Sequence, residues 1–158
     1  ESKCWWPTST MGHVTKASHF IRTAPLPEDF AARFAGLRSL TLANLRMKFV
    51  PKQLQGLALT HLNLSGNTLE SLPHWFGSLP LRELQLGDPW TGSWADESPS
   101  RRMLRSLGEW LNTAGETALP HTLQHLSLAD TKGLTQLPQA VRHMQALESL
   151  DIHCTACS

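Results

Sequence analysis

The sequence predicts an α/β fold, a curved solenoid in which short parallel strands alternate with short helices and 3-10 turns. The 158 residues include 27 leucines but only 3 valines and 2 isoleucines, whereas ordinary parallel sheets are rich in β-branched residues. The pattern Leu-x-x-Leu-x-Leu recurs five times, with its middle leucines 22, 22, 42 and 24 residues apart. An apolar residue followed by proline comes after three of these copies. Leucines at such a period indicate a leucine-rich repeat.

Each copy of the pattern predicts one short strand. The copies are Leu37-Leu40-Leu42, Leu59-Leu62-Leu64, Leu81-Leu84-Leu86, Leu123-Leu126-Leu128 and Leu147-Leu150-Ile152. Residues two apart in a strand point to the same side, so the paired leucines of each copy face one core. A single repeat cannot bury its own leucines, and we therefore expect consecutive strands to stack into a parallel sheet on the concave side.

The residues after each strand predict a convex return segment. We expect short helical or 3-10 segments near Pro51, Pro73 and Pro138. Proline suits the first helical position because its missing N–H would have no partner there. Trp75 and Trp110 are expected to pack in the convex part of the core.

One repeat carries an asparagine three residues after the second strand leucine. This residue, Asn67, is expected to bond the backbone of adjacent repeats. Leu45, Thr131 and Thr155 stand at the equivalent places, so the predicted asparagine ladder is incomplete.

We expect two regions, an N-terminal capping region over 1–36 and leucine-rich repeats over 37–158, with about four repeats and a truncated fifth. The capping region is predicted to hold an atypical strand near 14–18 and an arc from Pro25 to Phe30. Because the pattern stops just after its fifth strand, and an uncovered solenoid end exposes apolar surface, we expect the chain to be part of a longer protein.

The 42-residue interval predicts an insertion over about 87–120. Ser98, Pro99 and Gly115 can begin and end a helix near 99–113, whose apolar residues recur at helical spacing. The alternative is two degenerate repeats, which the lack of a Leu-x-Leu midway disfavours.

The strand residues between the leucines predict the candidate binding face. The first column runs Ser39, His61, Glu83, His125 and Ser149; the second runs Thr41, Asn63, Gln85, Ser127 and Asp151; the third runs Ala43, Ser65, Gly87, Ala129 and His153. Such a small, polar and nearly uncharged concave face suits a protein partner bound through hydrogen bonds and shape. The alternative is that these are only solvated strand residues.

A second candidate is the pair Trp90 and Trp94 in the inserted loop. Tryptophan is enriched at binding hot spots, and loops often carry function. The alternative is that both rings cover the edge of the inserted helix. Arg101, Arg102 and Arg105 are interpreted as a solvated helix face, or else as a contact for an acidic partner.

Several classes of function are disfavoured. A net charge of +1 and 17% charged residues do not indicate a nucleic-acid protein. No apolar run approaches the roughly 18 residues of a membrane helix, and no secretory signal peptide opens the chain. Cys154 and Cys157 lack the second ligand pair of a zinc site. We also disfavour a metal site at His61, Glu83 and His125. No cofactor, metal or catalytic residue is predicted.

The repeats resemble those of leucine-rich-repeat type III secreted effectors of plant-pathogenic bacteria, particularly the Xanthomonas outer proteins. The likeness spans roughly 14–158 and rests on the arc 25–37 with the following strand, on 64–73, on the enlarged repeat after Leu86, and on 126–138. The Trp-rich loop departs from the pattern. The resemblance implies a module that selects a host protein, delivery into the host cytoplasm, and suppression of plant immunity. It also implies a separate C-terminal E3 ubiquitin ligase domain, which nothing in this sequence matches.

The leading hypothesis is a monomeric, non-catalytic recognition module for a host protein. One alternative is a scaffold or interaction domain of an intracellular signalling protein. Two others are a solenoid that itself contributes to catalysis and a structural homo-oligomer formed through the last repeat.

Overall fold

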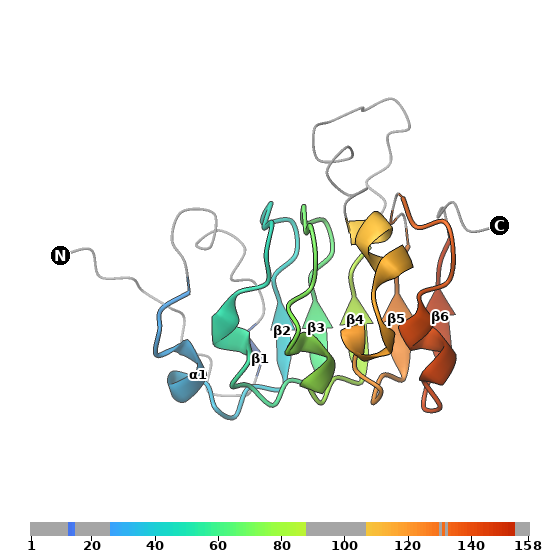
Figure 1. The fold of residues 1–158 in the computed structure, drawn as a ribbon. Helices are drawn as coiled ribbons and strands as arrows, with labels where there is room; N and C mark the ends of the chain where they lie inside the picture. Colours follow the sequence, from blue (N-terminus) through green and yellow to red (C-terminus); the bar gives the residue numbers. More distant parts are fainter. Residues whose placement is uncertain (1–12, 15–25, 88–106, 130, 132, 154–158) are drawn as a thin grey trace.

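A computed structural model of the protein describes residues 13–14, 26–87, 107–129, 131 and 133–153 (Figure 1). Its centre is one parallel sheet whose six strands lie in sequence order. The strands are β1 (His13–Val14), β2 (Ser39–Thr41), β3 (His61–Asn63), β4 (Glu83–Gln85), β5 (His125–Ser127) and β6 (Ser149–Asp151). Leu40, Leu62, Leu84, Leu126 and Leu150 are aligned across β2 to β6. The predicted leucine-rich-repeat solenoid is therefore confirmed.

Short helical segments return the chain on the other side of the sheet. They are α1 (Phe30–Arg33), η1 (Lys52–Leu54), η2 (Phe76–Ser78), η3 (Glu116–Ala118) and η4 (Gln139–His143). Residues 107–113 are also helical. In Figure 1 these segments stand in front of the strands, which leaves the opposite sheet face uncovered by the described elements.

Pro51 and Pro138 lie one residue before the helical position predicted for them, and Pro73 lies three residues before η2. Pro51 and Pro138 come immediately before η1 and η4, with ψ angles of 131° and 140°. They therefore end the extended segment and do not occupy the first helical residue. Their carbonyls still accept the first turn's hydrogen bonds, from Leu54 N at 3.1 Å and Val141 N at 3.0 Å.

The core is a continuous stack of leucines between the sheet and the convex segments. The middle leucines of β2 to β5 are all buried, whereas Leu150 of β6 is only partly buried. Phe76, the first residue of η2, is fully buried. Trp75 and Trp110 pack against this core but remain partly exposed, so the prediction that they are core residues holds only in part.

Asn67 bonds two neighbouring repeats, as predicted. Its Nδ2 donates to Leu42 O and Leu64 O, both at 2.7 Å, and its Oδ1 accepts from Leu45 N and Met47 N at 3.0 and 3.2 Å. Thr131, at the equivalent position after β5, is buried, and its Oγ1 has no hydrogen-bond partner among the described residues.

The enlarged repeat is one repeat and not two. β4 pairs directly with β5, from Glu83↔His125 to Gln85↔Ser127, so no further strand lies between them. The predicted helix is confirmed over 107–113, where Leu107 and Leu111 enter the core. Its predicted start at Pro99 and the loop before it lie outside the described residues.

A second asparagine bonds across this enlarged repeat. Asn112, in the helical segment, donates to Gly133 O at 2.8 Å and accepts from Thr135 N and Gln136 N at 3.1 and 3.3 Å. The sequence analysis did not identify this contact, because Asn112 lies outside the strand pattern. It ties the insertion to the turn that follows β5, in the next repeat.

The described part of the capping region covers the first repeat. Leu26 and Phe30 are buried, and the Phe30 and Phe34 rings lie 4.9 Å apart. Gln53 Nε2 donates to Leu26 O at 2.9 Å, which links the arc to η1. A strand of this region was predicted near 14–18; β1 is formed by His13–Val14 and pairs with β2.

Candidate functional site: the concave face of the sheet

Two of the three predicted columns lie side by side on the exposed, concave face, whereas in the third Ser65, Gly87 and Ala129 are buried. Ser39, His61, Glu83, His125 and Ser149 are successive partners across β2 to β6, and Thr41, Asn63, Gln85, Ser127 and Asp151 form the next aligned row. All ten residues are partly or fully exposed. The parallel register therefore gathers, on one surface, residues that lie up to 112 positions apart in the sequence, from Ser39 to Asp151.

Hydrogen bonds join the centre of this face into a fixed network. Ser65 donates through its backbone N–H and its Oγ to Asn63 Oδ1, at 2.9 and 2.6 Å. Asn63 Nδ2 donates to Gln85 Oε1 at 2.7 Å, and Gln85 Nε2 donates to Glu83 Oε1 at 3.0 Å. The amide of Gln85 is therefore held at both ends, and it in turn orients the Glu83 carboxylate.

Histidines flank Glu83 on both sides. His61 Nε2 lies 3.9 Å from Glu83 Oε2, while a hydrogen bond of 2.9 Å joins His61 Nδ1 to Thr60 Oγ1. His125 is the register neighbour of Glu83 on β5 and is exposed. The sequence analysis did not predict that Thr60 orients His61, because Thr60 lies outside the three columns.

A second carboxylate is held at the end of the sheet. Asp151 Oδ1 lies 2.6 Å from His153 Nδ1 and accepts from His153 N at 3.2 Å, and Ser127 Oγ donates to Oδ2 at 3.4 Å. The hydrogen bond from the His153 side chain lowers the pKa of Asp151, against a smaller opposing effect of burial. Asp151 is therefore ionised at neutral pH.

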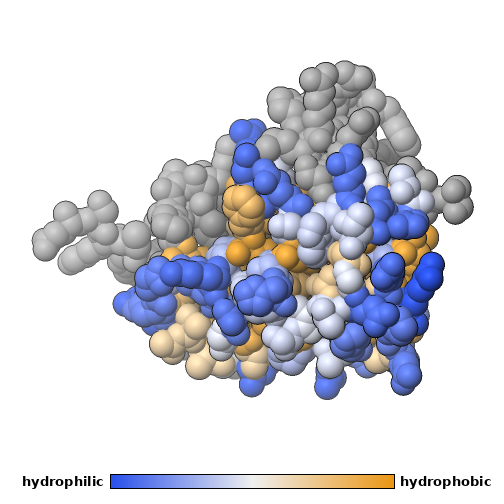
Figure 2. Space-filling model, in the orientation of Figure 1, coloured by the Kyte–Doolittle hydropathy of each residue, from blue (hydrophilic) through white to orange (hydrophobic). Residues whose placement is uncertain are grey.

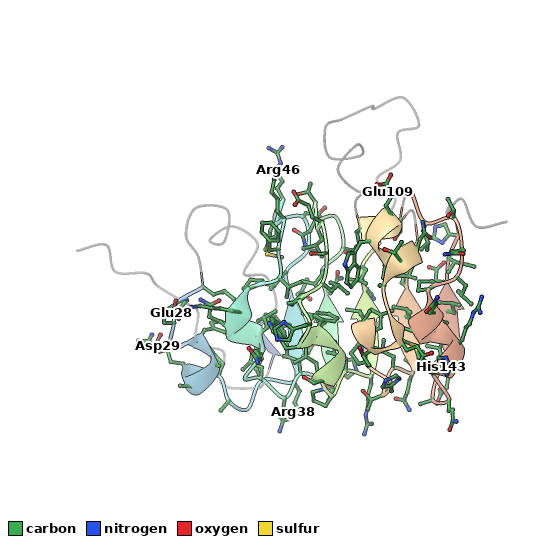
Figure 3. All side chains as sticks on the ribbon, viewed as in Figure 1. Glu28, Asp29, Arg38, Arg46, Glu109 and His143 are labelled. Atoms are coloured by element: carbon green, nitrogen blue, oxygen red, sulfur yellow. The ribbon has the colours of Figure 1, made fainter. Side chains whose placement is uncertain are left out.

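The concave face contains carboxylate side chains but no lysine or arginine. Within the three columns the acidic side chains are Glu83 and Asp151, and no lysine or arginine occurs. Arg38 lies below the face, where its Nη1 donates to the carbonyls of Leu37 and Ala58 at 3.5 and 3.4 Å; Figure 3 shows its side chain directed away from the strands.

Other charged residues lie at the convex side and form ion pairs there. Lys52 pairs with Glu28 at 3.2 Å and His143 with Glu116 at 3.1 Å. The labelled side chains of Glu28, Glu109 and His143 point outwards from the helix-bearing side in Figure 3. Figure 2 shows this same side, where hydrophilic residues predominate and apolar surface appears between them.

Several sequence hypotheses lie beyond this part of the chain. Three sets of residues fall outside the described residues: Trp90 and Trp94, the arginine cluster at 101, 102 and 105, and Cys154 and Cys157.

Across the described ranges, no group of three histidine, cysteine or acidic side chains is arranged to hold a metal ion. Within the same described ranges, no helix is long and apolar enough to cross a membrane. Phe49, which the sequence analysis did not single out, is 62% exposed.

Comparison with known proteins finds one repeat. The family model described as Leucine Rich Repeat matches residues 58–79, which contain β3 and the convex segment η2. No curated protein matches the sequence. The chain therefore contains a leucine-rich repeat within a solenoid of such repeats. A domain of this kind is typically a non-catalytic module for protein–protein interaction.

Proposed function

We propose that the chain is a recognition module whose concave face binds a host target protein. The observation that supports this best is the aligned set of ten polar side chains, which every described element leaves uncovered and at whose centre Asn63, Gln85 and Glu83 are joined by hydrogen bonds. Side chains that are already oriented lose less conformational freedom on binding, which favours affinity.

The finer proposal is that the module resembles the substrate-recognition repeats of a bacterial effector that suppresses plant immunity through an E3 ubiquitin ligase domain. Its support is the resemblance in the arc 25–37, the segment 64–73 and the segment 126–138. On this proposal the protein is delivered by a type III system into the host cytoplasm and acts there as a monomer. The module chooses the target, and ubiquitin transfer belongs to another domain.

The alternative is an interaction domain of an intracellular signalling protein with no ligase partner. The same concave face would then serve as a scaffold surface. Size-exclusion chromatography with light scattering at several protein concentrations tests the monomer, since a scaffold that self-associates through its last repeat would gain mass with concentration.

The test of the binding face is capture from plant extract. Three forms of the 158-residue chain are cross-linked to extract proteins and compared by quantitative mass spectrometry. They are the unaltered chain, a concave variant (His61→Ala, Glu83→Ala and His125→Ala) and a convex control (Glu28→Ala, Lys52→Ala and Glu109→Ala). We expect the concave variant to capture about tenfold less of the target, because a few central contacts contribute most of the binding energy of an interface. The convex control should retain it.

The opposite result would refute the assignment. If the concave variant keeps its circular dichroism spectrum and still captures the same protein to the same extent, the concave face is not the binding surface. A target that instead follows the convex control would move the interface to the helix-bearing side.

A further inference from the structure

We infer that the concave face binds a basic segment of its partner, with one cationic side chain at Glu83 and a second at Asp151. This inference rests on the proposed function, since it specifies the chemistry of the partner that the concave face accepts. It starts from an asymmetry of the face: two oriented carboxylates and no lysine or arginine among its fifteen column positions.

The first carboxylate has one oxygen occupied within the sheet. Gln85 Nε2 donates to Glu83 Oε1 at 3.0 Å, whereas Oε2 faces His61 Nε2 only at 3.9 Å, which is beyond hydrogen-bond distance. The Glu83 side chain retains 38% of its exposure. An arginine or lysine from a partner can therefore reach the carboxylate without displacing the bond that orients it.

The second carboxylate lies two strands further along the same face. Asp151 retains 46% of its side-chain exposure, and its pKa is lowered. Its Oδ1 takes both bonds from His153, whereas Oδ2 has only the 3.4 Å contact with Ser127 Oγ. Both carboxylates therefore present one weakly engaged oxygen.

The spacing of the two carboxylates sets the geometry of the partner. Glu83 is aligned with Ser149 through His125, and Asp151 lies two residues beyond Ser149 along β6. With strands 4.8 Å apart and a rise of 3.3 Å per residue, the two backbone positions are separated by about 12 Å. An extended segment spans this distance with cationic residues about three or four positions apart.

The residues between the two carboxylates are uncharged acceptors and donors. Ser127 and Ser149 lie between them in the register, beside His125. A segment that crosses the strands can therefore place small or polar residues between its two cations. An acidic segment would bring like charges against both carboxylates, which is unfavourable.

The test uses three synthetic peptides and the full 158-residue chain. Each peptide is built from glycine and serine and carries, at two positions about four residues apart, either arginine, glutamine or glutamate. Binding is followed by ¹⁵N-HSQC titration, which locates the contact. We expect the arginine peptide to shift the amide resonances of β4 and β6. The glutamine and glutamate peptides should bind at least about threefold more weakly.

Variants of the protein assign the effect to the two carboxylates. Glu83→Gln and Asp151→Asn each keep side-chain shape and lose one charge, and each should weaken binding of the arginine peptide about three- to tenfold. Glu109→Gln, on the convex side, removes the same charge elsewhere and should change nothing. Equal losses in all three variants, equal binding of the glutamine peptide, or no shifts in β4 and β6 would overturn the inference.

A failure of the basic-segment inference can be distinguished from a failure of the proposed function. A target captured from extract could depend on the concave face and still bind Glu83→Gln and Asp151→Asn as tightly as the unaltered chain. That result would support the recognition module and refute the binding of a basic segment. A target indifferent to the whole concave face would remove both.

Discussion

Asn67 illustrates how one side chain can organise the turn between two repeats. It is buried, and its amide satisfies two carbonyls and two N–H groups. Because backbone groups in such a turn cannot reach water, the amide replaces hydrogen bonds that the chain cannot make with itself. The position could be predicted from the repeat, since it lies three residues after Leu64.

Replacing Asn67 should be the most damaging polar substitution in the described turns. Asn67→Ala removes four hydrogen bonds at once and leaves buried backbone groups without partners. We expect the free energy of unfolding to fall by about 2–4 kcal/mol. Urea denaturation followed by circular dichroism measures it, and a loss below about 0.5 kcal/mol would contradict the role assigned to the amide.

The equivalent threonine should behave in the opposite way. Thr131 Oγ1 is buried without a hydrogen-bond partner among the described residues, so its hydroxyl carries an uncompensated cost of desolvation. Thr131→Val keeps the shape and removes the hydroxyl. The free energy of unfolding should stay constant or rise by about 1 kcal/mol. A marked destabilisation in the same urea assay would show that the hydroxyl is bonded in solution.

We expect Asp151 to make the free energy of unfolding slightly dependent on pH. Its pKa in the folded protein is below that in the unfolded chain, because the His153 side chain bonds the ionised carboxylate. The stabilisation is therefore present above the unfolded pKa and is lost as pH falls through the folded pKa, in the acid range below about pH 4. For this half-exposed pair we expect about 0.2–1 kcal/mol. Asp151→Asn should reduce the difference between urea unfolding at pH 6 and pH 3 by that amount, and an unchanged difference would argue against it.

At the scale of elements, the strands of the five leucine copies could be predicted to within a residue, whereas the convex segments could be predicted only approximately. Strand positions follow from the leucine spacing, because a shift by one residue would turn every leucine out of the core. Pro51 and Pro138 lie one residue before the first helical residue predicted for them, because a proline fits the end of an extended segment as well as a first helical turn. Asn112 reaches a repeat 21 positions away, and no local pattern predicts such a contact.

A glycine just after β4, Gly87, is required by the close approach of the neighbouring repeat. A Cβ on Gly87 would overlap the backbone carbonyl of Ala129, the next residue in its column, whereas a Cβ on Gly36 would have no atom within 4 Å. We expect Gly87→Ala to destabilise the protein by about 1–3 kcal/mol. Gly36→Ala, the control, should change the melting temperature little. Equal melting temperatures for both variants would contradict the close approach.

At the scale of the molecule, the composition of the candidate site could be predicted and its internal contacts could not. Spacing alone placed Glu83 beside His61 and His125, because parallel strands align residue by residue. The chain of amides that orients Glu83 depends on side-chain rotamers, and the pairing of Asp151 with His153 depends on a turn after the last leucine pattern. A sequence pattern specifies neither.

The solenoid should be least stable at its last described strand. Each repeat contacts only its neighbours, so stability is a sum of repeat and interface contributions. β3 and β4 are paired on both sides over buried leucines, whereas β6 pairs with β5 alone and its Leu150 is only partly buried. Amide hydrogen exchange measured by mass spectrometry should therefore show faster exchange in β6 than in β3 and β4, by about tenfold or more. Adding a tightly bound concave-face partner should slow β6 most, because it bridges that strand to the stable centre. Uniform protection from β3 to β6 would instead mean that the sheet opens only as a single cooperative unit.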